Sequence, residues 1–222
     1  MEEIILIGAS GLAREVIGTL SGSNFQRVIG VLDDDPNAVG SRCGGMPVLG
    51  SSLDLERFPR ARVLVCVGSG AARERIVARL CLPPECYATV VDASVRNPAG
   101  CPVGAGSIIL AHVTITADAI VGRHVVMMPA VTVTHDDRVD DFVTLAAGVS
   151  LGGGVSVERG AYLGMNSCVR QGITIGEYST LGMGAVLLRA LPKGEIWAGV
   201  PARRLERQQA SRLVDSSVEA SR

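Results

Sequence analysis

One histidine of the chain is followed directly by acidic residues. His135 stands in the run Thr134-His135-Asp136-Asp137. A neutral imidazole has the right pKa to accept a proton near neutral pH, and a neighbouring carboxylate raises its basicity and fixes its tautomer. The run therefore has the chemistry of a general base, and the alternative interpretation is a solvated polar bend.

An aliphatic residue or Met recurs at every sixth position over much of the chain. A six-residue period matches neither a helix nor a free-standing strand, and it indicates a solenoid in which each hexad forms a short strand and a bend. One hexad cannot bury its own aliphatic residue, so neighbouring turns must stack to form a core. We call this set the aliphatic series: Val103, Ile109, Ile115, Val121, Met127, Val133, Val139, Leu145, Leu151, Val157, Leu163, Val169, Ile175, Leu181 and Leu187.

Small residues accompany the aliphatic series. The fifth place of nearly every hexad is small or β-branched, and Asp137 is the exception. Because a bend without a loop needs small residues, we expect the glycines directly after members of the series to form the bends. These glycines are Gly104, Gly122, Gly152, Gly164, Gly176 and Gly182.

The tandem pattern resembles the hexapeptide-repeat acyltransferases, and the run Gly199-Val200-Pro201-Ala202-Arg203 is similar to their usual ending. With its N-terminal segment, over about residues 3–205, the chain resembles the bacterial sugar acyltransferases that include sialic-acid O-acetyltransferases and UDP-4-amino-sugar N-acetyltransferases. This resemblance implies a left-handed parallel β-helix with three hexads per turn. It also implies acetyl-CoA as co-substrate and a homotrimer with its site at a subunit interface.

Three aliphatic runs before the repeat predict buried strands, at Glu3–Ile7, Val28–Leu32 and Val63–Val67. The first and third runs each lead through a glycine turn into a stretch with helical spacing. The stretch after the third run extends from about residue 71 to 80. Strands that alternate with helices predict a small Rossmann-like parallel sheet with ligands at the carboxyl ends of its strands. Residues 88–91 are a candidate fourth strand. We expect a Rossmann-like α/β domain over residues 1–90, a β-helix over 91–205 and a tail over 206–222.

The first turn, Gly8-Ala9-Ser10-Gly11, offers free N–H groups at a helix N-terminus, where a phosphate is favoured. Asp33 follows Gly11 by 22 residues, about where a dinucleotide fold places its ribose-binding acid. The alternatives are a ligand-free turn and ordinary loop chemistry for the aspartates. Because the middle glycine of the dinucleotide fingerprint is missing, we favour a nucleotide sugar over NAD.

The family resemblance also implies roles for particular residues. Near a nucleotide-linked sugar it places Ser10, Gly11 and Leu12 by the phosphates and sugar, Asp33 and Asp34 by the base or ribose, and Gly68 in the pocket lining.

In the coil, the resemblance makes His135 the general base and Asp136 its orienting acid. With three hexads per turn, Gly152-Gly153-Gly154 stack beside Thr134, His135 and Asp136 (135 + 18 = 153). This side-chain-free shelf suits a thioester, and the Gly153 N–H suits a developing oxyanion. The resemblance places acetyl-CoA in a groove between two coils, and the residues expected near it are Thr144, Met165 and Met183.

Composition excludes several classes of function. The net charge of −1 offers no attraction to nucleic acid, and no apolar run reaches the ~20 residues of a membrane span. The chain opens without a signal peptide and its six cysteines form no Cys-x-x-Cys pair, so we expect a cytoplasmic protein with reduced cysteines. The three histidines, His112, His124 and His135, fall on three different faces of the coil, so no metal site is expected.

These observations favour an acetyl-CoA-dependent N-acetyltransferase that acts on a nucleotide-linked amino sugar in bacterial glycan biosynthesis. One alternative is an O-acetyltransferase of sialic acid or another sugar hydroxyl, for which nucleotide-binding features would have no use. The other is a non-catalytic solenoid scaffold, in which substitution of His135 would change nothing measurable.

Overall fold

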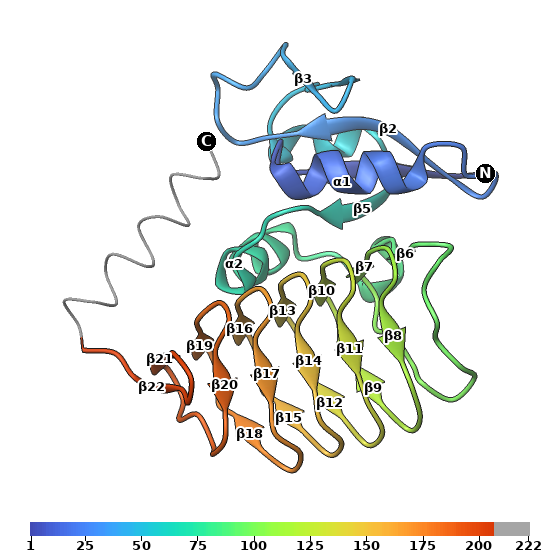
Figure 1. Ribbon diagram of the computed structural model, residues 1–222. Coiled ribbons are helices and arrows are strands. Elements are labelled where there is room, and N and C mark those ends of the chain that lie inside the picture. Colours follow the sequence, from blue (N-terminus) through green and yellow to red (C-terminus); the bar gives the residue numbers. More distant parts are fainter. Residues whose placement is uncertain (207–222) are drawn as a thin grey trace.

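The computed structural model describes residues 1–206, which form a small α/β unit lying over a long parallel coil (Figure 1). The expected tail lies outside the described residues beyond Glu206. In the described part of the chain, no helix is both long and apolar enough to cross a lipid bilayer.

A three-stranded parallel sheet in the order β2-β1-β5 forms the centre of the N-terminal unit. Side chains alternate between the two faces of a strand. Ile4 and Leu6 of β1 therefore pack on the side of α1, whereas Ile5 and Ile7 pack on the side of α2. The elements are β1 (Glu2–Ile7), α1 (Gly11–Leu20), β2 (Gln26–Leu32), β3 (Arg42–Cys43), β4 (Met46–Pro47), η1 (Ser52–Arg57), β5 (Arg62–Val65), α2 (Gly70–Leu80) and η2 (Pro84–Cys86).

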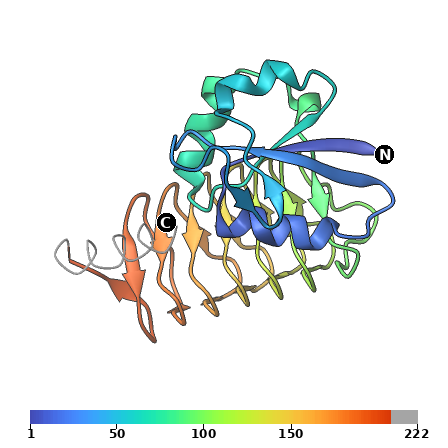
Figure 2. The same ribbon diagram turned by 90° about the horizontal axis from the view of Figure 1, so that it is seen from above.

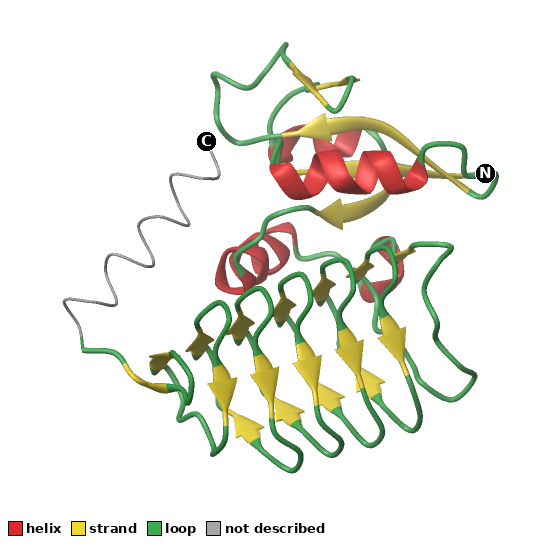
Figure 3. Cartoon of the chain, in the orientation of Figure 1, coloured by secondary structure: helices red, strands yellow, loops and turns green. Residues whose placement is uncertain are grey.

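The coil consists of three parallel sheets of very short strands joined by tight corners (Figure 3). The first sheet contains β6 (Val90–Val91), β7 (Ile108–Ile109), β10 (Val126–Met127), β13 (Thr144–Leu145), β16 (Tyr162–Leu163), β19 (Thr180–Leu181), β21 (Ile196–Ala198) and the antiparallel β22 (Arg203–Arg204). The second contains β8 (Thr114–Ile115), β11 (Thr132–Val133), β14 (Ser150–Leu151), β17 (Cys168–Val169) and β20 (Val186–Leu187). The third contains β9 (Ile120–Val121), β12 (Arg138–Val139), β15 (Ser156–Val157) and β18 (Thr174–Ile175).

Paired strands of one coil sheet lie 18 residues apart, as in the pairing of Val126 with Thr144 and of Arg138 with Ser156. Three hexads therefore make one turn. The aliphatic series from Ile109 to Leu187 is at most 4 % exposed and lies in one continuous core. The predicted fold class, a small parallel α/β unit followed by a β-helix, is confirmed.

The expected role of the glycines after the aliphatic series is wrong. The left-handed backbone that makes each corner occurs two places later, at every sixth residue from Gly106 to Gly184, and includes Asp136 and Phe142. The earlier glycines serve close stacking instead, because a Cβ on Gly164 would lie 2.5 Å from the Met183 amide nitrogen of the next turn.

The candidate fourth strand does not belong to the N-terminal sheet. Val90 and Val91 form β6, which pairs with β7 of the coil. Just before it, Tyr87 bridges to Val63 of β5. This segment therefore joins the two units through backbone hydrogen bonds on both sides.

The N-terminal unit covers the first coil sheet, as the two views in Figures 1 and 2 show. Ile108 and Val126 of this sheet share one apolar cluster with Leu12 and Val16 of α1. Further along the coil, α2 places Arg73 against the same sheet, where its guanidinium donates to Thr144 Oγ1. The packed interface fixes the unit on one side of the coil.

Candidate active site

His135 lies at the corner between the second and third coil sheets, after β11 and before β12. Its Nδ1 lies 2.8 Å from Asp136 Oδ2, and both side chains are 67 % exposed. Asp136 adopts the left-handed backbone of the corner (φ 64°), a conformation that Asp tolerates better than most residues. The corner thus presents an imidazole and its carboxylate together at the surface.

The contact with Asp136 decides the tautomer of His135. A carboxylate only accepts hydrogen bonds, so Nδ1–H donates and Nε2 keeps a lone pair. The hydrogen bond to Asp136, together with the charges of Asp136 and Asp137, raises the pKa of His135 above its ordinary value. This is the arrangement of a basic imidazole whose free nitrogen faces away from its carboxylate.

Gly153 lies beside that free nitrogen on the next turn of the coil. A Cβ built on Gly153 would lie 2.3 Å from His135 Nε2, and Gly154 N–H donates to the His135 carbonyl oxygen at 2.9 Å. Within residues 1–206, no acceptor takes the Gly153 N–H. An imidazole lone pair and a free amide donor are therefore neighbours at one exposed corner.

We expect Gly153→Ala to lower kcat of the predicted acetyl transfer about 100-fold, because the methyl group of the alanine must push the His135 imidazole away from this position. The backbone of Gly153 is not left-handed and the displaced ring atoms are solvent-exposed, so the melting temperature should stay near the wild-type value. Steady-state kinetics and a thermal melt test both parts. Unchanged kcat would show that the ring needs no access to this shelf.

Asp137, noted in the sequence only as a break in the repeat, is fully buried beneath the His135 corner. Its Oδ2 accepts from Thr134 N–H at 2.7 Å and its Oδ1 from Val155 N–H at 2.8 Å. Burial raises the pKa of Asp137 to about 6 although both amide hydrogen bonds oppose the shift. A charged residue at an interior place of the repeat is the sequence signal for this contact.

Thr144 does not face a groove between coils, which corrects its expected contact with acetyl-CoA. Its side chain is 4 % exposed and lies under the N-terminal unit. Its hydroxyl donates to Gly68 O at 2.9 Å and accepts from Arg73 at 3.0 Å. The side chain is occupied by the contact between the two units.

Met165 and Met183, the other residues expected near acetyl-CoA, are exposed by 48 % and 68 %. They lie at the corner between the first and second coil sheets, directly after β16 and β19. His135 and Gly153 lie at the corner between the second and third sheets. One protomer therefore does not bring the two groups together.

The residues expected at the phosphates lie where α1 begins. Ser10 caps the helix by accepting from Ala13 N–H at 3.2 Å, and its hydroxyl donates to Cys66 O at 2.6 Å. Gly11 is the first helical residue and is exposed. Leu12 is 8 % exposed and packs into the apolar core. Gly11 therefore presents open backbone, whereas the Leu12 side chain mainly supports the sheet.

Asp33, Asp34 and Gly68 follow the carboxyl ends of β2 and β5. Asp33 accepts from Ala9 N–H at 2.6 Å and so ties the first turn to the second strand. Partial burial raises the pKa of Asp34, but hydrogen bonds from Ser52 and contact with Arg79 outweigh it and lower the pKa. The structure gathers these residues with Ser10 and Gly11 at one edge of the sheet, on the opposite side of the coil from the His135 corner.

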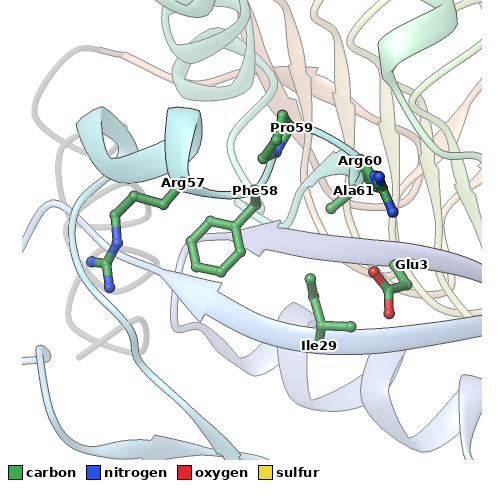
Figure 4. A pocket seen from close by; sticks show the side chains of 7 residues that line it. All are labelled: Glu3, Ile29, Arg57, Phe58, Pro59, Arg60 and Ala61. Carbon is green, nitrogen blue, oxygen red and sulfur yellow. The ribbon is translucent and has the colours of Figure 1, made fainter.

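A hollow of about 200 Å³ lies elsewhere, on the α2 side of the N-terminal sheet (Figure 4). It contains none of the expected site residues and is shallow, so we do not assign it to the reaction. Its lining residues are Glu3, Ile29, Arg57, Phe58, Pro59, Arg60 and Ala61.

The other two histidines are separate from His135. His112 is exposed, whereas His124 is 5 % exposed and stacks on Phe142. Burial and the charge of Arg73 lower the pKa of His124 to about 4. Across residues 1–206, no three His, Cys, Asp or Glu side chains gather in a way that could hold a metal ion.

Known proteins match both parts of the chain. Residues 3–80 match the PglD N-terminal domain family. PerB of Caulobacter crescentus, in a structure with CoA and GDP-perosamine, is 28 % identical with a TM-score of 0.84, and the match covers 93 % of this chain and 98 % of PerB. By sequence alone, no curated protein matches significantly.

Two further structures match over nearly their whole length. The acetyltransferase domain of PglB from Neisseria gonorrhoeae is 27 % identical with a TM-score of 0.82, over 92 % of this chain and 100 % of that domain. WeeI from Acinetobacter baumannii is 25 % identical with a TM-score of 0.77, with the same coverage. These matches bear out the resemblance expected from the sequence: the chain is similar over nearly its whole length to solved bacterial sugar acetyltransferases, and its first part to the PglD N-terminal domain.

Proposed function

We propose that the protein transfers the acetyl group of acetyl-CoA to the amino group of a nucleotide-linked sugar. The observation that carries the proposal is the His135 corner, where Asp136 leaves the Nε2 lone pair beside the open amide of Gly153. Relatives of similar architecture support it, since PerB was captured with CoA and GDP-perosamine. We assign nucleotide-sugar binding to residues 1–90 and acetyl transfer to residues 91–205.

In this reaction the sugar amine attacks the thioester carbonyl carbon. His135 Nε2 takes the proton that the amine loses, and the Gly153 N–H donates to the oxyanion of the tetrahedral intermediate. The carbon–sulfur bond then breaks and the CoA thiolate leaves with the electron pair. Asp136 holds the imidazole in the correct tautomer and stabilises the imidazolium that forms.

We further propose that the enzyme is a homotrimer whose site combines two protomers. In a single chain the nucleotide candidates lie over the first coil sheet, on the opposite side of the coil from the His135 corner. The second sheet lies between the His135 corner and the Met165 corner, and its outward side chains carry no charge: Thr114, Thr132, Ser150, Cys168 and Val186. Threefold packing of these sheets would place the His135 corner of one protomer beside the Met165 corner and N-terminal unit of the next.

In this arrangement Met165 and Met183 of one protomer would line the acetyl-CoA groove opposite His135 of another. We place the reaction in the cytoplasm, where acetyl-CoA is made, and in the synthesis of a bacterial glycan that uses an acetylated amino sugar. Light scattering of the purified protein should give three times the mass of one chain.

The decisive experiment measures thiol release from acetyl-CoA with a panel of acceptors. The panel contains UDP-, GDP- and dTDP-linked amino sugars, the matching free amino sugar and sialic acid. We expect turnover with one nucleotide-linked amine and little with the free sugar, because the N-terminal unit would hold the nucleotide.

Turnover with sialic acid alone would instead establish an O-acetyltransferase. No turnover with any acceptor would favour the scaffold. The product of a positive reaction should carry an amide, which mass spectrometry and alkaline hydroxylamine distinguish from an ester.

A further inference from the structure

Hydrogen bonds between successive turns of the coil follow a regular rule. The residue directly after each member of the aliphatic series donates its N–H to the series member of the next turn. Gly122 donates to Val139 O at 2.7 Å, and Asp140 donates to Val157 O at 2.8 Å. The rule holds from Gly104 to Arg170 with a single exception among the described residues.

The exception is Thr134, the residue before His135. Its N–H donates to Asp137 Oδ2 at 2.7 Å instead of to Leu151. The Leu151 carbonyl oxygen accepts the Thr134 hydroxyl at 3.1 Å. Between β11 and β14 only Thr132 and Ser150 remain paired, whereas the neighbouring strands keep two pairs. The backbone ladder is therefore interrupted between the turn of His135 and the turn of Gly153.

Asp137 connects these same two turns through its other oxygen. Oδ1 accepts from Val155 N–H at 2.8 Å, two residues beyond Gly153. The carboxylate has no solvent exposure, and the fifth places of the adjacent hexads hold Val131 and Val143. A valine at this place would fit the core, so a buried carboxylate is the costlier choice for folding.

We propose that Asp137 is a positioning residue for acetyl transfer: it withdraws Thr134 N–H from the coil ladder and thereby sets the backbone from which His135 projects onto Gly153. The inference rests on the proposed function, because it concerns the geometry of the same base. It assigns Asp137 no contact with substrate. The side chain acts through the backbone of the His135 turn and of the turn above it.

The role needs the charged form of Asp137, since an ionised carboxylate accepts stronger hydrogen bonds from the two amide groups than a protonated one does. The titratable groups near it are His135 and Asp136 on its own turn and Asp118 on the turn below. The residues of the turn above, Gly152, Gly153, Gly154 and Val155, do not titrate. The next residue of the chain, Arg138, is charged but exposed to solvent. Burial raises the pKa of Asp137 to about 6, so acidification removes this charge in the range where His135 is protonated.

The first test compares Asp137→Val with a matched variant, Ser107→Val. Ser107 also occupies the fifth place of its hexad, has no exposure, and its hydroxyl accepts from Val125 N–H at 3.0 Å, at a corner without His135. We expect Asp137→Val to lower kcat about 10-fold while KM for acetyl-CoA changes less than about twofold. Its melting temperature should equal or exceed that of the wild type, because a buried charge is removed. Ser107→Val should retain wild-type kcat.

Full activity of Asp137→Val would overturn the inference and leave the proposed function standing. Loss of kcat in both variants would do the same, since it would show a general effect of repacking the coil. If the wild type fails with every acceptor, the proposed function falls and this inference falls with it.

The second test uses Asp137→Asn, which keeps the shape but not the titration. Below pH 6, the plot of log kcat/KM against pH should be steeper by one proton for the wild type than for Asp137→Asn, measured with the same acceptor. The Thr134 amide signal in NMR should move with a midpoint near pH 6 in the wild type and stay fixed in the variant. Equal slopes, or a Thr134 amide that does not titrate, would overturn the inference, and the NMR result does so whichever acceptor the enzyme uses.

Discussion

Replacement of His135 by alanine should lower kcat for acetyl transfer by about 100- to 10 000-fold, the contribution usual for a positioned general base. The reason is that the corner offers Nε2 as the basic atom beside the open amide of Gly153. KM for acetyl-CoA should change little, because the imidazole acts on the proton of the acceptor amine.

The side chain of His135 is 67 % exposed, so its loss should leave the melting temperature unchanged. His112→Ala provides the control, since His112 is an exposed histidine on the same coil. Equal losses in both variants, or full activity of His135→Ala, would refute the assignment. Ligand binding without turnover, in the wild type and the variant alike, would fit the scaffold instead.

The pH dependence of kcat should also report His135 as the general base. Asp136 raises the pKa of His135, so the imidazole becomes protonated and unable to act as a base at a higher pH than an ordinary histidine. On the acid limb of the kcat profile, activity should therefore fall at a higher pH than an ordinary histidine base would give.

The coil could be predicted from the sequence because its structure is local and repeated. A period of six residues with three hexads per turn fixes which residues are neighbours, and this placed Gly153 beside His135 without further information. The pairing of His135 with Asp136 was equally direct, since the two residues are adjacent and share one corner. Their chemical roles stay predictions until activity is measured.

The position of the N-terminal unit could not be read from the repeat. Thr144 has the pattern of any outward strand residue of the coil, and only the packed interface shows that its hydroxyl bonds Gly68 rather than a ligand. The glycines misled for a related reason. The glycines after the aliphatic series are small because the next turn of the coil stacks closely on them. The left-handed corner positions lie two residues later, and some of them, such as Asp136 and Phe142, are not glycines.

Arg73 of α2 is the residue that fixes this interface, and its sequence context gave no sign of the role. The side chain has no exposure, yet no carboxylate accepts from it within the described residues. Burial lowers its pKa to about 9, which still leaves it charged at cellular pH. Its six acceptors come from both units: Val67 O, Gly68 O, His124 O, Phe142 O, Val143 O and Thr144 Oγ1.

Arg73→Met should therefore destabilise the protein by about 3–5 kcal/mol, because several buried carbonyl groups would lose a charged donor and no water replaces it. Denaturant unfolding measures this loss, and Arg75→Met, an exposed arginine on the same helix, should cost less than about 0.5 kcal/mol. Arg73 and Thr144 both donate to Gly68 O, and Gly68 is expected to line the nucleotide-sugar pocket. The variant should therefore also raise KM for the nucleotide sugar more than KM for acetyl-CoA. A stable Arg73→Met variant would mean that apolar packing of α1 on the first coil sheet is enough to hold the two units together.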